Sequence, residues 1–242
     1  MKIKSSNFWL PKQGNSIDEY EDAFAPEAIV EEECQIFRCA VADGAAESSF
    51  AKLWANLLVD GYCKGFNLEA LQKSWREEVS RYSLAWYAEQ KAESGSFAAL
   101  VGLTLNDDRT WAVKAIGDSC VAQIREEKLL TCLPIGEANQ FDNNPHLLCS
   151  KEENNQDLKQ FWLNTTGAWE AEDHFLLMSD ALAKWFLQRQ EKYADAPARF
   201  VSFSNQEDFN SFVESERACL DETGQPNLKN DDVTLIRVNI LE

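Results

Sequence analysis

Residues 35–44 read QIFRCAVADG, an apolar run with a β-leaning centre that ends in Asp-Gly. This composition predicts a strand followed directly by a turn, which carries Asp43 to the edge of a sheet. Residues 174–180, HFLLMSD, repeat the arrangement, and Asp180 is predicted at the end of a second strand. Two strands of the same design therefore each deliver an aspartate to a strand end.

Helices and hairpins are predicted around these two strands. Ser48 and Ser49 are expected to cap a helix over residues 48–65, and Asn67 a longer one over residues 67–95. Apolar residues at helical spacing predict further helices at 181–193 and 204–222. Short apolar runs over 96–133, separated by NDDR and REE turns, predict an antiparallel meander, and residues 231–241 predict a closing strand.

Composition excludes several classes of function. The chain of 242 residues carries 23 Lys and Arg against 41 Asp and Glu, a formal net charge of -18. This charge would repel nucleic acid and an anionic membrane surface, so neither is expected as a partner. Seven cysteines without a CxxC pair, and only two histidines, argue against a disulfide framework and a zinc site.

The length of the chain predicts one domain over residues 1–242. No signal-peptide or membrane-spanning run is found, so we expect a cytoplasmic location.

Acidic residues recur at the edges of the predicted strands. They are Asp22, Asp43, Asp118, Asp180 and Asp231. Each one alone is more simply a turn residue, because Asp is common at turns. Together, converging carboxylates would repel one another and would need a cation, and hard ions such as Mg²⁺ or Mn²⁺ prefer oxygen ligands.

Five short motifs, in this order, resemble the metal-dependent protein phosphatase family of the 2C type, in its compact bacterial form. They are EDAF at 21–24, VADG at 41–44, IGDS at 116–119, LLMSDAL at 176–182 and DDVTLI at 231–236. The resemblance covers roughly residues 15–240. It implies an α+β fold, a four-layer αββα sandwich of two antiparallel β-sheets flanked by helices.

The resemblance also implies a role for each acidic position. Asp43 would bridge two Mg²⁺ or Mn²⁺ ions, the carbonyl of Gly44 would ligate one, and Asp180 and Asp231 would hold the other. Glu21 and Asp22 would lie near the metal-bound waters, and Asp118 would join Asp180 at a weaker third ion. The implied activity is hydrolysis of phosphoserine or phosphothreonine by a metal-bridged hydroxide, with Asp22, Asp43, Asp180 and Asp231 as the catalytic set. The implied partner is a phosphorylated protein of a Ser/Thr kinase pathway, in signal transduction.

The sequence departs from the family pattern at four places. Ile17 stands where the family usually has a phosphate-binding arginine; Lys12 and Arg38 are possible substitutes, although solvated surface charge is the simpler interpretation of both. The turn after Asp43 is Ala45-Ala46-Glu47 in place of a glycine-rich turn, without the histidine that serves some members as a general acid. The usual Asp-Gly and Asp-Asn pairs are replaced by the two pairs Asp180-Ala181 and Asp231-Asp232.

Three hypotheses follow from these motifs and departures. The first is an active metal-dependent protein phosphatase. The second is a catalytically weak or inactive relative that binds a partner protein, which the missing arginine favours. The third is a hydrolase of small phosphate esters. Fold alone does not separate them.

Overall fold

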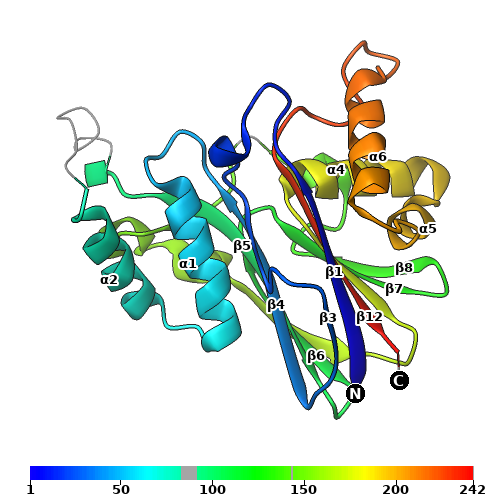
Figure 1. Cartoon of the computed structure of the whole chain (residues 1–242), viewed down its shortest axis with the longest axis horizontal. Coiled ribbons are helices and arrows are strands. Elements are labelled where there is room, and N and C mark those ends of the chain that lie inside the picture. Colours follow the sequence, from blue (N-terminus) through cyan, green and yellow to red (C-terminus); the bar gives the residue numbers. More distant parts are fainter. Residues whose placement is uncertain (83–91, 143, 242) are drawn as a thin grey trace.

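Two six-stranded antiparallel sheets pack face to face in the computed structural model, which describes residues 1–82, 92–142 and 144–241 (Figure 1). In spatial order, the first sheet contains β3 (Val30–Glu33), β1 (Lys2–Leu10), β12 (Val233–Ile240), β11 (His174–Met178), β7 (Cys120–Arg125) and β8 (Lys128–Leu133). The second contains β10 (Leu163–Ala168), β6 (Thr110–Ile116), β5 (Phe97–Asn106), β4 (Ile36–Gly44) and β2 (Ala23–Ala25), and the short β9 (Leu148–Cys149) also pairs with β5.

Helices cover the outer face of each sheet. Against the second sheet lie α1 (Ala51–Lys64) and α2 (Leu68–Val79), and against the first lie α4 (Asp180–Tyr193), α5 (Ala196–Val201) and α6 (Gln206–Ala218) (Figure 1). Short 3-10 helices span Ile17–Glu19 (η1), Ala138–Gln140 (η2), Glu152–Asn155 (η3) and Leu158–Phe161 (η4). The predicted four-layer αββα sandwich of the α+β class is confirmed. Within the described residues, no helix is both long and apolar enough to cross a membrane.

Alternation along the strands divides the apolar residues among three interfaces. In β4, Cys39 and Val41 face the other sheet, whereas Ala40 and Ala42 face α1. Successive side chains of a strand point to opposite faces, so one strand supplies two cores. The small alanines let α1 pack closely on the sheet, with the fully buried Trp54 in the same cluster.

The predicted meander is the first correction. Residues 110–124 form two strands, β6 and β7, which belong to different sheets. The chain crosses between the sheets at Gly117, whose φ of +91° favours glycine. The hairpins β5–β6 and β7–β8 form as predicted on either side of this crossing. Asp118 therefore lies in the crossover between the two sheets.

Two helix predictions also need correction. Ser48 and Ser49 do not cap α1: its N-cap is Phe50, and the hydroxyl of Ser48 instead accepts a hydrogen bond from Phe97 N at 3.2 Å. The helix predicted over 67–95 begins as expected, with the Asn67 side chain accepting from Ala70 N, but ends at Val79 and is followed by a turn at 80–82. Its predicted continuation over 83–91 lies outside the described residues.

Candidate metal centre

Asp43 and Gly44 form the end of β4, paired with Ala99 and Ala98 of β5. A Cβ on Gly44 would lie 2.7 Å from the carbonyl oxygen of Glu21, so only glycine allows the backbone of Glu21 to approach this strand end. Burial raises the pKa of Asp43 well above its usual range, and the charges of other aspartates raise it further, namely Asp22, Asp180, Asp118 and Asp231. The end of β4 is thus the point where the acidic residues meet.

Asp22 precedes β2 and is 3% exposed. Its Oδ2 accepts a hydrogen bond of 2.6 Å from the hydroxyl of Thr234 on β12, and this hydroxyl also contacts the hydroxyl of Tyr20. Burial raises the pKa of Asp22 well above its usual range, against the lowering effect of the Thr234 bond. The neighbouring Glu21 also has a raised pKa, because of burial and then the charge of Asp232.

Asp118 enters the same region from the crossover between the sheets. It is 8% exposed, and burial followed by the charge of Asp180 raises its pKa to about 7. The charge of Lys229 lowers this pKa, but burial and the charge of Asp180 outweigh it. Asp118 is therefore a third buried carboxyl with a raised pKa, beside Asp22 and Asp43.

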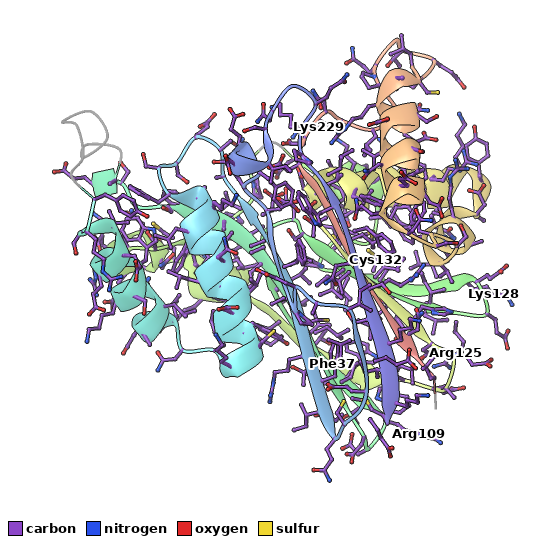
Figure 2. All side chains as sticks on the ribbon, viewed as in Figure 1. Phe37, Arg109, Arg125, Lys128, Cys132 and Lys229 are labelled. Atoms are coloured by element: carbon purple, nitrogen blue, oxygen red, sulfur yellow. The ribbon has the colours of Figure 1, made fainter. Side chains whose placement is uncertain are left out.

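Asp180 and Asp231 close the cluster from the side of the first sheet. Asp180 is the first residue of α4, and its Oδ1 accepts a 2.5 Å hydrogen bond from the backbone N–H of Ala181. Asp231 lies two residues before β12, and Arg217 of α6 donates a hydrogen bond to its backbone carbonyl. Figure 2 labels Lys229 at this end of the sandwich, where its Nζ lies 2.6 Å from Asp231 Oδ2 and 3.7 Å from Asp180 Oδ2.

The structure thus brings the sequence-predicted acidic residues to one edge of the sandwich from five segments of the chain, Glu21 and Asp22 being adjacent. Within the described ranges, no three His, Cys, Asp or Glu side chains are grouped as a ready-made metal site. Asp22 is hydrogen-bonded to Thr234, Asp180 to the backbone N–H of Ala181, and Asp231 is paired with Lys229. The acidic residues offer only oxygen donors, and burial followed by neighbouring negative charge raises the pKa values of Asp22, Asp43 and Asp118, so the donor set suits a hard divalent cation.

Asp232 was noted in the sequence only as a departure from the family pair, and Thr234 was not singled out, although both build the site. Asp232 Oδ1 accepts from Lys12 N at 2.8 Å, and Oδ2 accepts from Glu21 N at 2.7 Å. An asparagine here would offer only one acceptor oxygen, so the change from the usual Asp-Asn pair has a structural reason. A side chain that bonds two distant backbone N–H groups leaves no pattern in the sequence.

The departures noted in the sequence are placed as follows. Ile17, in η1, is 65% exposed beside the acidic edge, and Lys52 Nζ lies 3.3 Å from its carbonyl oxygen. Lys12 and Lys52 are close enough to lower the pKa of Glu21. Arg38 lies near the opposite end of β4, opposite Thr104 of β5, and is removed from the site. Lys229, which sequence reasoning did not consider, is the cation in direct contact with the predicted ligands.

Comparison with known proteins places this site in a family. The model of the protein phosphatase 2C family matches residues 18–230. No curated protein matches the chain. Among solved structures, the photosystem II phosphatase PBCP has a TM-score of 0.62 at 16% identity, covering 98% of each chain.

Two further similar structures are complexes with metal ions. The catalytic domain of the serine threonine phosphatase PstP in complex with two manganese ions has a TM-score of 0.59 at 15% identity, covering 100% of this chain and 99% of that one. RsbX in complex with magnesium has a TM-score of 0.56 at 19% identity, covering 98% of this chain and 95% of that one. These likenesses agree with the fold, and the family match spans the acidic residues from Glu21 to Asp180. The chain belongs to the protein phosphatase 2C family of metal-dependent serine/threonine phosphatases, which use Mg²⁺ or Mn²⁺.

Proposed function

We propose that the acidic edge is the active site, in which Asp43 bridges two Mg²⁺ or Mn²⁺ ions and Asp180 and Asp231 hold the second. The Gly44 carbonyl completes the first, while Glu21 and Asp22 order the surrounding waters. Asp118 joins Asp180 at a weaker third ion. The observation that carries this proposal is the convergence at one edge of the buried carboxyls of Asp22, Asp43 and Asp118, whose pKa values are raised by burial and further by the charges of neighbouring aspartates.

Bound divalent ions supply a hydroxide for attack on phosphorus and stabilise the charge that develops on the phosphoryl oxygens. The residues of the chain orient this chemistry. Asp232 fixes the backbone of Glu21, Thr234 fixes the carboxylate of Asp22, and Arg217 fixes the backbone of Asp231. Such second-layer hydrogen bonds set the orientation of metal-binding carboxylates.

The substrate class we propose is phosphoserine or phosphothreonine in a protein, of the kind a Ser/Thr kinase produces in signal transduction. One relative, PppA, is described as a key regulatory component of a secretion system. The net charge of -18 argues against nucleic acid or an anionic membrane as a partner. We further propose that residues 1–242 act as one domain, since both sheets share one core, and that the protein works in the cytoplasm with reduced cysteines.

A non-catalytic binding module remains the second candidate, because Ile17 replaces the phosphate-binding arginine. Nothing in the described part of the chain favours it over the phosphatase. Lys229 and Lys52 both bring positive charge to the acidic edge, so the loss of that arginine does not leave the site without cations.

Hydrolysis of a chromogenic aryl phosphate tests the proposal. Turnover is expected with Mn²⁺ or Mg²⁺, none with chelator, and a loss of at least about a hundredfold in Asp180→Asn. Asp60→Asn, on the exposed face of α1, is the matched control and should keep full activity. Turnover that survives chelator, or that Asp180→Asn leaves unchanged, would refute the assignment.

A further inference from the structure

A groove of about 680 Å³ extends from the acidic edge along α4. One wall is α4 and the other is the loop 219–230 that joins α6 to β12, drawn orange to red in Figure 1. At one end it reaches Ala181 and Lys229, which neighbour the proposed ligands Asp180 and Asp231. At the other end it reaches Tyr193 in the last turn of α4. One end of the groove therefore lies beside the proposed active site.

Positive side chains line this groove although the chain as a whole is strongly acidic. Lys184, Arg189, Lys192 and Lys229 contribute four of the 23 basic residues of the chain. Lys184, Gln188 and Lys192 recur at intervals of four residues, so they form one row on the face of α4. A groove with an excess of one sign of charge concentrates ligands of the opposite sign.

The acidic residues of the groove are engaged within the protein. Glu216 Oε2 accepts hydrogen bonds from Trp185 Nε1 at 3.1 Å and from Asn227 Nδ2 at 3.2 Å. Asp221 Oδ1 accepts from the backbone N–H groups of Thr223 and Gln225, which closes the local turn. Both carboxylates keep their negative charge, so the lining contains four basic and two acidic side chains and has an excess of two positive charges.

The lysines of the groove differ in how strongly they are paired within the protein. Within the described residues Lys184 forms no ion pair, and Lys192 has only a 3.4 Å pair with Glu222, whose side chain is 91% exposed. Exposed pairs of this kind contribute little. Lys229 is paired with Asp231 and Asp180, whose charge would be shared with metal in the loaded enzyme. Arg189 is held by two bonds of 2.6 Å to Asp195 and serves the structure instead.

The length of the row on α4 sets the length of peptide that can lie along it. Asp180 to Lys192 spans twelve helical steps, about 18 Å at 1.5 Å per residue. An extended peptide rises about 3.3 Å per residue, so about five residues of substrate would lie along it.

We propose that this groove binds the substrate segment beside the phosphorylated residue and selects segments that carry acidic side chains or a further phosphate. The inference rests on the proposed phosphatase function and names the substrate class of that site. Lys184 and Lys192 determine the preference, and Lys229 links the groove to the metal centre.

Matched phosphopeptides test the selection. One carries acidic residues for five positions on each side of the phosphoserine, and its pair carries glutamines there. The acidic peptide should show a kcat/KM about tenfold higher, mainly through KM, and the advantage should fade at high salt. The double substitution Lys184→Gln with Lys192→Gln should abolish the advantage and leave aryl phosphate hydrolysis unchanged. Lys64→Gln with Lys73→Gln, on exposed faces of α1 and α2, should retain it.

Equal kcat/KM values for the two peptides in the unmodified protein would overturn the proposal. An equal loss toward aryl phosphate in the double variant would also overturn it, because it would reveal a general structural defect. Binding provides a readout that needs no turnover. Fluorescence anisotropy measures binding of the labelled acidic phosphopeptide to the Asp43→Asn variant. Adding Lys184→Gln and Lys192→Gln to this variant should weaken binding about tenfold. Unchanged binding there refutes the groove, whereas absent aryl phosphate hydrolysis refutes only the phosphatase assignment.

Discussion

Two carboxylate sites at different ends of the sandwich are built in opposite ways. Asp173, fully buried, accepts hydrogen bonds from Gln123 Nε2, Glu170 N and both Nε and Nη2 of Arg125. Burial raises its pKa, but the hydrogen bonds from Arg125, Glu170 N and Gln123 together outweigh burial and hold the pKa below its usual value. At the acidic edge, burial and the charges of neighbouring aspartates raise the pKa values of Asp22, Asp43 and Asp118.

Figure 2 shows the two sites well apart, with Arg125 labelled near one end of the molecule and Lys229 near the other. A buried carboxylate is normally paired within the protein, as Asp173 is. Buried carboxylates that lie close together without enough positive charge repel one another, and binding of a cation reduces this repulsion. The contrast supports the proposal that the acidic edge is a binding site, whereas the Asp173 site is part of the scaffold.

The largest effect is expected from Asp43→Asn. Removing the proposed bridging carboxylate should lower kcat for aryl phosphate by about a thousandfold or more, because both ions lose a ligand. The measurement is steady-state hydrolysis with saturating Mn²⁺. Asp107→Asn, in the exposed hairpin after β5, is the matched control. Activity within tenfold of the unmodified protein would place the chemistry elsewhere.

Asp173→Asn should lower the stability of the protein and leave its metal binding nearly unchanged. It leaves Arg125 without its partner and should lower the free energy of unfolding by about 3 kcal/mol, as when one member of a buried ion pair is removed. Chemical denaturation measures the loss, and Mn²⁺ affinity by calorimetry should stay within about twofold. A metal-binding defect with unchanged stability would show that the two sites are not separate.

The metal-free protein should respond to pH through the acidic edge. The pKa of Asp118 is raised from 3.8 to about 7 in the folded state, so the folded state binds more protons between these values and stability falls as pH rises through them. The thermal midpoint without metal should therefore be lower at pH 8 than at pH 5.5, and Asp118→Asn should reduce this difference. Excess Mn²⁺ should remove it, because metal binds the ionised carboxylates. An identical pH profile in Asp118→Asn would contradict the role of repulsion.

The smallest effect is expected from Lys229→Met. Its ammonium pairs with Asp231 and Asp180, so it competes with metal for these oxygens. Removing it should tighten Mn²⁺ binding by about threefold to tenfold, in keeping with a partly exposed ion pair. Titration calorimetry provides the measurement, with Lys64→Met as the control. Weaker Mn²⁺ binding in Lys229→Met would show that the lysine supports the metal centre.

The resemblance to the 2C family implied the fold class, and apolar periodicity and strand-end aspartates predicted individual elements because they are local signals. Asp43 and Asp180 each follow a strand that the pattern shows directly. The first strand, β1, was not predicted: its central residues KSSN are polar, yet Ser5 is fully buried because β1 lies between β3 and β12. Burial of a polar residue by its sheet neighbours is a tertiary effect that periodicity does not report.

The same distinction applies to the site. The acidic positions could be predicted from the sequence because each lies near a strand or helix end. The residues that orient them could not be predicted, because Asp232, Thr234 and Arg217 act through hydrogen bonds to residues up to 220 positions away in the chain. Lys229 was overlooked for the same reason, since its position in a polar loop reveals nothing of the aspartates beside it. The ligand roles themselves stay a prediction until metal is observed.

Anomalous diffraction from crystals grown with Mn²⁺ tests the central claim most directly. The account predicts two strong peaks at the acidic edge, both in contact with Asp43, one also with the Gly44 carbonyl and the other with Asp180 and Asp231. Lys229 should have turned away from both carboxylates toward the groove along α4. Peaks at another place, or an acidic edge without any peak at saturating Mn²⁺, would contradict the account.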